Sequence, residues 1–137
     1  MIILVIILWL LAAVCNALMD VLSHHFEQSI FYRKNPYIWN PVHSWKNKYN
    51  GRDPKLGRRR FFYGLLVVHP AFTDAWHFAK SLMIVLITGC VVMGCAISSE
   101  PARWYELILE FVLLGLLWNT TFTFFYDVVF RKKKEGQ

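Results

Sequence analysis

Three long apolar blocks, each nearly free of charge, limit what this chain can fold into. The first, Ile2 to Met19, has no charged residue, the second ends at Ile97, and the third ends at Phe130. A run of about 20 apolar residues is long enough to cross the hydrocarbon core of a bilayer as a helix. Of the 137 residues, 56% are hydrophobic and only 18% are charged, which is more apolar than an average soluble domain. We therefore expect an all-α integral membrane protein, and not a soluble globule, a disordered chain or a disulfide scaffold.

The blocks predict a single membrane domain over residues 1–137, with spans at about 2–22, 77–97 and 106–130. The apolar run 61–68 is too short to cross a bilayer and ends at His69-Pro70, so we expect a short interfacial or re-entrant helix at about 58–69. A cleaved signal peptide is the alternative for the first block. Because that block lacks the basic residues of a signal peptide, we expect it to be a true span.

Lys and Arg are distributed very unevenly around these spans. Residues 33–60 carry nine of them and the tail 131–137 carries four, whereas the link between the second and third spans has only Arg103. Basic residues are retained on the cytoplasmic side of a membrane. The pattern therefore predicts an outside N-terminus, a cytoplasmic segment at about 32–60 and a cytoplasmic C-terminus, as in a bacterial inner-membrane protein.

The segment between the first two spans combines turn signals with aromatic and basic residues. Asn35-Pro36, Asn40-Pro41, Asn50-Gly51 and Asp53-Pro54 exclude one long helix there. Its aromatic residues favour the headgroup level of a membrane, where we expect the segment to lie. Arg58, Arg59 and Arg60 are expected to bind anionic lipid headgroups or a substrate phosphate, although they also serve as a simple topology signal. No nucleic-acid partner is expected, because no nucleic-acid-binding motif accompanies the charge.

Each span carries polar residues at helical spacing, and the orientation predicts that these stripes meet near the cytoplasmic side. The stripes are Asn16, Asp20, Ser23, His24 and Glu27 on the first span, Asp74, His77, Ser81 and Thr88 on the second, and Asn119, Thr123, Tyr126 and Asp127 on the third. The first stripe requires its helix to continue beyond the hydrocarbon, which the apolar residues at 21, 22, 26 and 30 permit. Polar groups at such positions usually face the interior of a bundle and mark a site.

Imidazole and carboxylate together form a ligand set for a divalent metal ion, with zinc the foremost candidate. The expected metal ligands are Asp20, His24, Asp74 and His77. Asp127 and Asp74 are the expected catalytic residues, as ligand or general base, and Asn16, Asn119 and the three arginines 58–60 are the expected substrate-binding residues. Simpler roles compete with each of these. Charge is tolerated at helix ends, Asp74 suits a helix cap, and Asp127 suits an ion pair with Lys132 or a nearby arginine.

Two classes of function fit this pattern. The first is a metal-dependent hydrolase that acts on a lipid-like or phosphate-bearing substrate at the membrane surface. The second is a non-enzymatic accessory subunit or a pore-forming oligomer, and transport of metal or protons would use the same residues as the hydrolase. Cys90, Gly94 and Ser98 form a ladder of small residues on the second span that suits close packing within the chain or self-association. Whether the chain is an enzyme is left open at this point.

Overall fold

The computed structural model describes residues 1–56, 70–97 and 103–132 of the chain. Over these residues the protein is helical, and three of its helices are long and apolar enough to cross a membrane. They are α1 (Ile2–His24), α4 (Ala75–Ile97) and α5 (Trp104–Thr123), with a π-helical turn η6 (Phe124–Phe130) that prolongs α5. The three predicted spans are thus confirmed as long apolar helices. The predicted interfacial helix at 58–69 lies outside the described residues.

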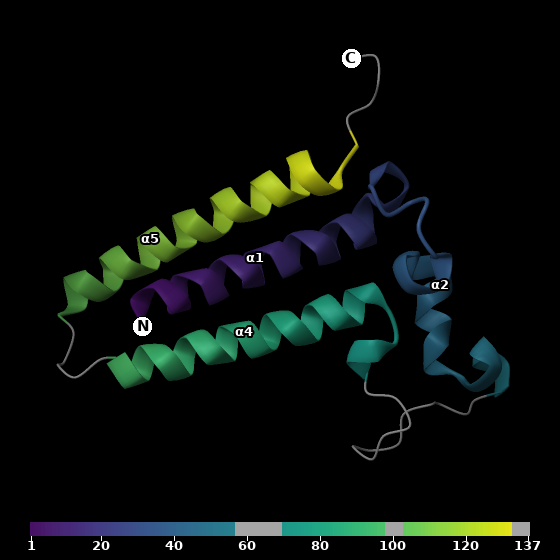
Figure 1. Cartoon of the computed structure of the whole chain (residues 1–137), viewed down its shortest axis with the longest axis horizontal. Helices are drawn as coiled ribbons and strands as arrows, with labels where there is room; N and C mark the ends of the chain where they lie inside the picture. Colours follow the sequence, from purple (N-terminus) through teal and green to yellow (C-terminus); the bar gives the residue numbers. More distant parts are fainter. Residues whose placement is uncertain (57–69, 98–102, 133–137) are drawn as a thin grey trace.

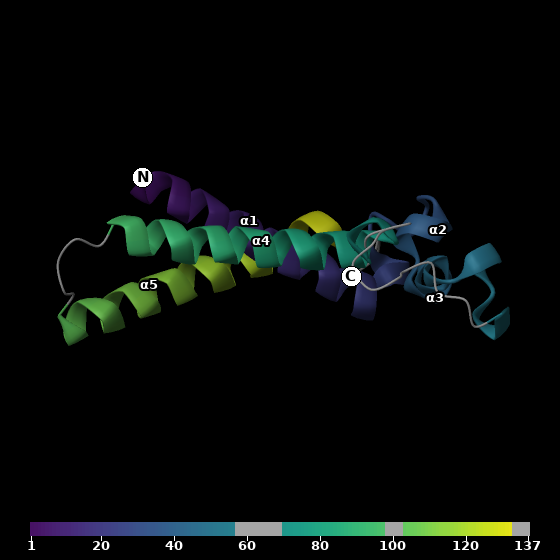
Figure 2. The ribbon, with the colours of Figure 1, turned by 90° about the horizontal axis from the view of Figure 1, so that it is seen from below.

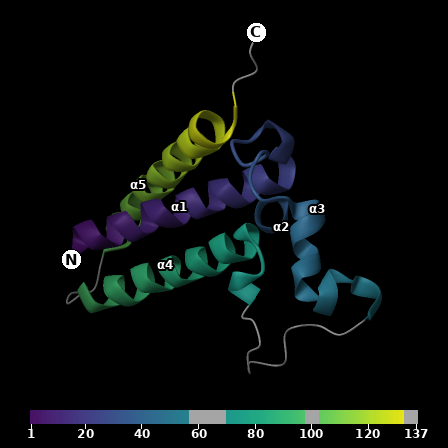
Figure 3. The ribbon, with the colours of Figure 1, turned by 45° about the vertical axis from the view of Figure 1, so that its right-hand side comes forward.

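Helix α1 is the centre of the bundle. It lies between α4 and α5 (Figures 1 and 3), packs along most of α4 and also contacts α5 and η6, whereas α4 and α5 hardly touch each other. The N-terminus lies at the same end of the bundle as the end of α4 and the start of α5 (Figures 1 and 2). The three helices therefore alternate in direction along the chain, which is compatible with three successive membrane spans.

Small side chains allow α1 and α4 to approach closely. Ala12, Cys15 and Met19 of α1 form one buried cluster with Ala79 and Leu86 of α4. An alanine presents no side chain beyond Cβ, so the larger neighbours can fill the space between the two helices. Among the described residues, the contact between α1 and α4 is the most extensive one between two helices.

The contact between α1 and α5 is narrower and depends on two tryptophans. The Trp9 indole N–H donates to the Leu114 carbonyl oxygen at 2.9 Å, and the rings of Trp9 and Trp118 meet edge to face with centroids 5.1 Å apart. An apolar ring with one polar N–H suits a helix contact in which a carbonyl is within reach. Most of α5 nevertheless stays uncovered, since none of its most apolar 18-residue window is buried by the described residues.

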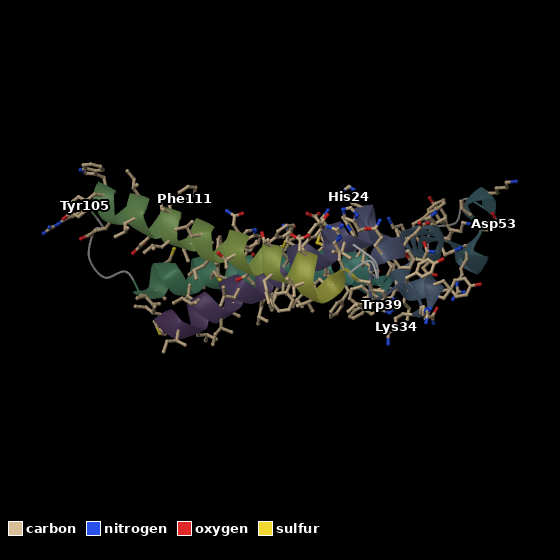
Figure 4. The ribbon with its side chains drawn as sticks, turned by 90° about the horizontal axis from the view of Figure 1, so that it is seen from above. His24, Lys34, Trp39, Asp53, Tyr105 and Phe111 are labelled. Atoms are coloured by element: carbon tan, nitrogen blue, oxygen red, sulfur yellow. The ribbon has the colours of Figure 1, made fainter. Side chains whose placement is uncertain are left out.

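The segment after α1 is a chain of short helical turns at one end of the bundle. They are η1 (Phe26–Gln28), α2 (Pro36–Trp39), α3 (Pro41–Ser44), η2 (Trp45–Lys48), η3 (Asn50–Arg52) and η4 (Pro54–Leu56), and η5 (Pro70–Phe72) precedes α4. Asn35 and Asn40 each cap the following turn through Oδ1, which accepts a backbone N–H at 3.0 and 2.9 Å. The expectation of turns in place of a long helix is confirmed. Asp53 in this segment and Tyr105 in α5 mark opposite ends of the molecule (Figure 4).

Helix α1 ends at His24, so four of the five residues of the first predicted stripe lie on it and Glu27 lies beyond its end. Ser29 forms an isolated antiparallel bridge with Arg131, in which the Ile30 N–H donates to the Phe130 carbonyl at 2.9 Å and the Lys132 N–H donates to the Gln28 carbonyl at 2.7 Å. These backbone groups cannot also extend the helix. The exit of η6 thereby fixes the path of the chain shortly after α1, and η1, which contains Glu27, is a separate turn.

Candidate functional site

Two ionisable side chains form a close hydrogen-bonded pair at the start of α4. Asp74 immediately precedes the helix, and its Oδ1 accepts the backbone N–H of His77 at 2.8 Å. The same carboxylate approaches Nδ1 of the His77 ring, with distances of 2.9 Å to Oδ1 and 2.8 Å to Oδ2. The Asp74 side chain is only 3% exposed, and that of His77 is 22% exposed. A buried carboxylate thus holds a ring that solvent can still reach.

This geometry fixes the chemistry of the imidazole. A carboxylate against Nδ1 requires that nitrogen to carry the proton, which leaves Nε2 as the acceptor in the neutral ring. A ring held in this way can take a proton at Nε2 while the carboxylate stabilises the resulting charge. The predicted i, i+3 pair is therefore brought together, but its two members bond to each other.

Residues of the segment between α1 and α4 form hydrogen bonds next to the Asp74 and His77 pair. The Thr73 hydroxyl lies 3.4 Å from Asp74 Oδ2, and the Asn47 amide donates to the carbonyl oxygens of Thr73 and Tyr37, at 2.6 Å each. Asn47 thereby ties η2 and α2 to the start of α4. No sequence pattern predicts this role, because Asn47 and Thr73 are 26 residues apart and meet only in the folded chain.

The other predicted metal ligands lie apart from this pair. His24 is exposed at the end of α1, on the face opposite Lys34 and Trp39 (Figure 4). Across the described ranges, no group of three or more His, Cys, Asp or Glu side chains could hold a metal ion. Asp20, His24, Asp74 and His77 therefore do not form one preassembled centre, and binding of zinc by these residues stays a prediction.

His24 instead lines an open cavity of about 410 Å³ at the end of α1. Ser23 and His25 share this cavity with Glu27 of η1 and Asn40 before α3, and neither Asp74 nor His77 contributes to its lining. The ring of His25 also meets the Tyr126 ring edge to face, with centroids 5.6 Å apart. The polar end of the first predicted stripe thus faces the connecting segment and not α4.

The rotation of α4 explains this separation. Ala75, Ala79 and Leu86 are buried in the clusters that α4 forms with α1. At 100° per residue, His77 points roughly opposite to the mean direction of these three side chains. The polar side of α4 is consequently turned away from α1.

The remaining predicted site residues have other surroundings. Asp127 is 49% exposed and pairs with Arg131, whose Nη1 lies 3.0 Å from Oδ1, so the expected ion pair with an arginine is present. A catalytic role of Asp127 stays a prediction. Asn16 is half-buried on α1 and Asn119 is exposed on α5. Arg58, Arg59 and Arg60 lie outside the described residues, so their binding of headgroup or substrate stays a prediction.

The small-residue ladder on α4 is used within the chain at one of its positions. Cys90 is buried, and its thiol lies 3.4 Å from the Val5 carbonyl oxygen of α1. A Cβ added at Gly94 would meet nothing within 4 Å, and Ser98 lies outside the described residues. Self-association through this ladder stays a prediction.

Comparison with known proteins adds no assignment to this geometry. No family model, curated protein or solved structure matches the chain.

Proposed function

We propose that the chain is an integral protein of a bacterial inner membrane, with its N-terminus outside and its C-terminus in the cytoplasm. The alternating helices put the connecting segment and the end of η6 at one end of the bundle (Figure 1). Among the described residues, that end carries eight Lys and Arg, at positions 33, 34, 46, 48, 52, 55, 131 and 132, whereas the other end has only Arg103. Retention of Lys and Arg in the cytoplasm supports this orientation.

Fusion reporters test the orientation. Green fluorescent protein attached after Gln137 should fluoresce, because it folds in the cytoplasm, and alkaline phosphatase attached there should be inactive. Alkaline phosphatase attached after Arg103 should be active, because that link is expected outside. The reverse pattern at both positions would contradict the proposed orientation.

We infer further that the Asp74 and His77 pair is the acid–base centre of a hydrolase acting on a lipid-like ester or phosphoester at the membrane surface. The observation that carries this proposal is the buried Asp74 carboxylate against Nδ1 of a partly exposed His77 ring. A positioned imidazole contributes about 10²- to 10⁴-fold to a hydrolytic rate. Because the ring stands at the start of α4, an amphiphile could reach it while its tail stays in the bilayer.

The proposed step needs water and the ester alone. His77 Nε2 removes a proton from water as the water oxygen bonds to the carbonyl carbon or phosphorus of the substrate. The bond to the leaving oxygen then breaks, and that oxygen receives the proton from Nε2. Asp74 keeps the Nδ1 proton in place throughout and stabilises the imidazolium between the two transfers.

Asp74→Asn separates this role from helix capping. Asparagine caps helices about as well as aspartate, so the fold should persist, but its amide can place the proton on Nε2 and remove the base. We expect hydrolysis of p-nitrophenyl octanoate or bis(p-nitrophenyl) phosphate by the reconstituted chain to fall at least about 100-fold in D74N and in His77→Gln.

His43→Gln is the matched control, because His43 is exposed in α3 and contacts the ring of Tyr37. Its rate should equal that of the unchanged chain. If neither probe is hydrolysed, or if D74N and the unchanged chain hydrolyse them equally, the pair is a helix cap and the hydrolase proposal fails.

A further inference from the structure

One side of α5 has a regular pattern that nothing in the described chain covers. The side facing α1 carries Trp118 and the Leu114 carbonyl. The opposite side carries six residues at intervals of four, three, four, three and four, and all six are exposed. They are Tyr105, Leu109, Val112, Leu116, Asn119 and Thr123, which together we term the α5 seam.

Alternating steps of three and four residues are the spacing of the contact positions in paired helices. Leu109 and Leu116 are each 59% exposed and Val112 is 47% exposed. Such exposure has no meaning by itself in a membrane, because lipid tails are as apolar as leucine. The informative residue of the α5 seam is the one whose polar side chain finds no hydrogen-bond partner in lipid tails.

That member is Asn119. It lies in the central part of the 27-residue apolar stretch Trp104–Phe130, and no hydrogen bond of its side chain to another described residue is present. A polar side chain at this depth is costly against lipid, and amide side chains in membrane helices commonly bond across to a neighbouring helix. The amide is therefore expected to face another polypeptide.

We propose that two copies of this chain pair in the membrane through the α5 seam, with the two Asn119 amides hydrogen-bonded to each other. All copies have the same orientation in one membrane, so two α5 helices can pair only in parallel. A two-fold axis along the membrane normal then brings Asn119 opposite Asn119. An amide both donates and accepts, so it is complementary to itself, as opposite charges are to each other.

The second copy fits better than an unrelated partner for this reason. A different helix would need its own polar group at the same depth, whereas a second α5 supplies one at the required level by symmetry. Glu110 cannot form the polar contact between the two copies. Nine residues separate it from Asn119, and at 100° per residue this places it on the opposite side of α5. The seam also points away from α1, so pairing leaves the start of α4 uncovered.

Crosslinking and energy transfer test the pairing in the full chain. With Leu116→Cys, copper-catalysed oxidation in vesicles should give a disulfide-linked dimer, whereas Leu117→Cys should not, although both leucines are exposed. Asn119→Leu should weaken energy transfer between C-terminal fluorophores, with the apparent dissociation constant rising about 3- to 30-fold. Asn119→Gln, which keeps the amide, should retain part of the association.

Gly94→Leu is the control for the other candidate surface, since an added side chain there meets nothing within the chain. It should leave energy transfer unchanged. The proposal is overturned if the unchanged chain is monomeric, if L117C crosslinks as readily as L116C, or if G94L disrupts association and N119L does not. The hydrolase proposal is independent of these outcomes, because its readout is turnover of the two ester probes.

Discussion

Replacing Ala12 by phenylalanine is expected to separate α1 from α4. Ala12 is 0% exposed and belongs to the buried cluster that includes Ala79 and Leu86 of α4. A benzyl side chain at this position has no space to enter, and overpacking of a close contact costs about 1–3 kcal/mol or more. We expect the free energy of unfolding, measured in mixed detergent micelles, to fall by about 3 kcal/mol or more.

Leu11→Phe is the matched control for this substitution. It adds an aromatic ring one position earlier, where the leucine is 48% exposed and faces outward from the bundle. The free energy of unfolding of L11F should stay within about 0.5 kcal/mol of the unchanged chain. Equal losses in A12F and L11F would mean that α1 and α4 do not pack through Ala12.

Ser29→Ala is expected to release the junction between the first and last helices. The Ser29 side chain is fully buried, donates to the Phe26 carbonyl at 2.7 Å and accepts the Phe31 N–H at 3.2 Å. Its loss leaves the buried Phe31 N–H without this acceptor, at a cost of about 1–3 kcal/mol, whereas the Phe26 carbonyl keeps its bond from the Ser29 backbone N–H. The Ile30 and Lys132 amides donate to the Phe130 and Gln28 carbonyls across the junction. Their hydrogen exchange should accelerate about 5- to 150-fold, which is that free energy expressed as a ratio of rates.

Ser23→Ala removes a hydroxyl from an exposed position on α1 and should leave both exchange rates unchanged. If S29A also leaves the exchange of Ile30 and Lys132 unchanged, the serine hydroxyl does not hold the junction.

The long helices could be predicted because their signal is local. Charge-free runs such as residues 2–19 need no tertiary partner to favour a helix in a membrane. The Asn-Pro pairs at 35 and 40 are equally local, since each asparagine caps the turn that its proline begins. In both cases the residues that decide the structure are neighbours in sequence.

The candidate site was predictable only in part. Asp74 and His77 are three residues apart, so their proximity follows from one helical turn. Whether His24 joins them depends on the rotation of α4 about its axis, which is set by where Ala79 and Leu86 pack on α1. The end of α1 and the role of Asn47 depend on residues distant in sequence, and local patterns contain no such information.

The central place of α1 has a consequence for how the protein is made. The two later helices are consecutive in the chain and joined by a short link, yet they are not partners of each other. Synthesis from the N-terminus therefore delivers first the one helix on which both of the others pack. A hairpin of α4 and α5 alone would have few contacts between its two helices, so we expect each of them to be added to α1 separately.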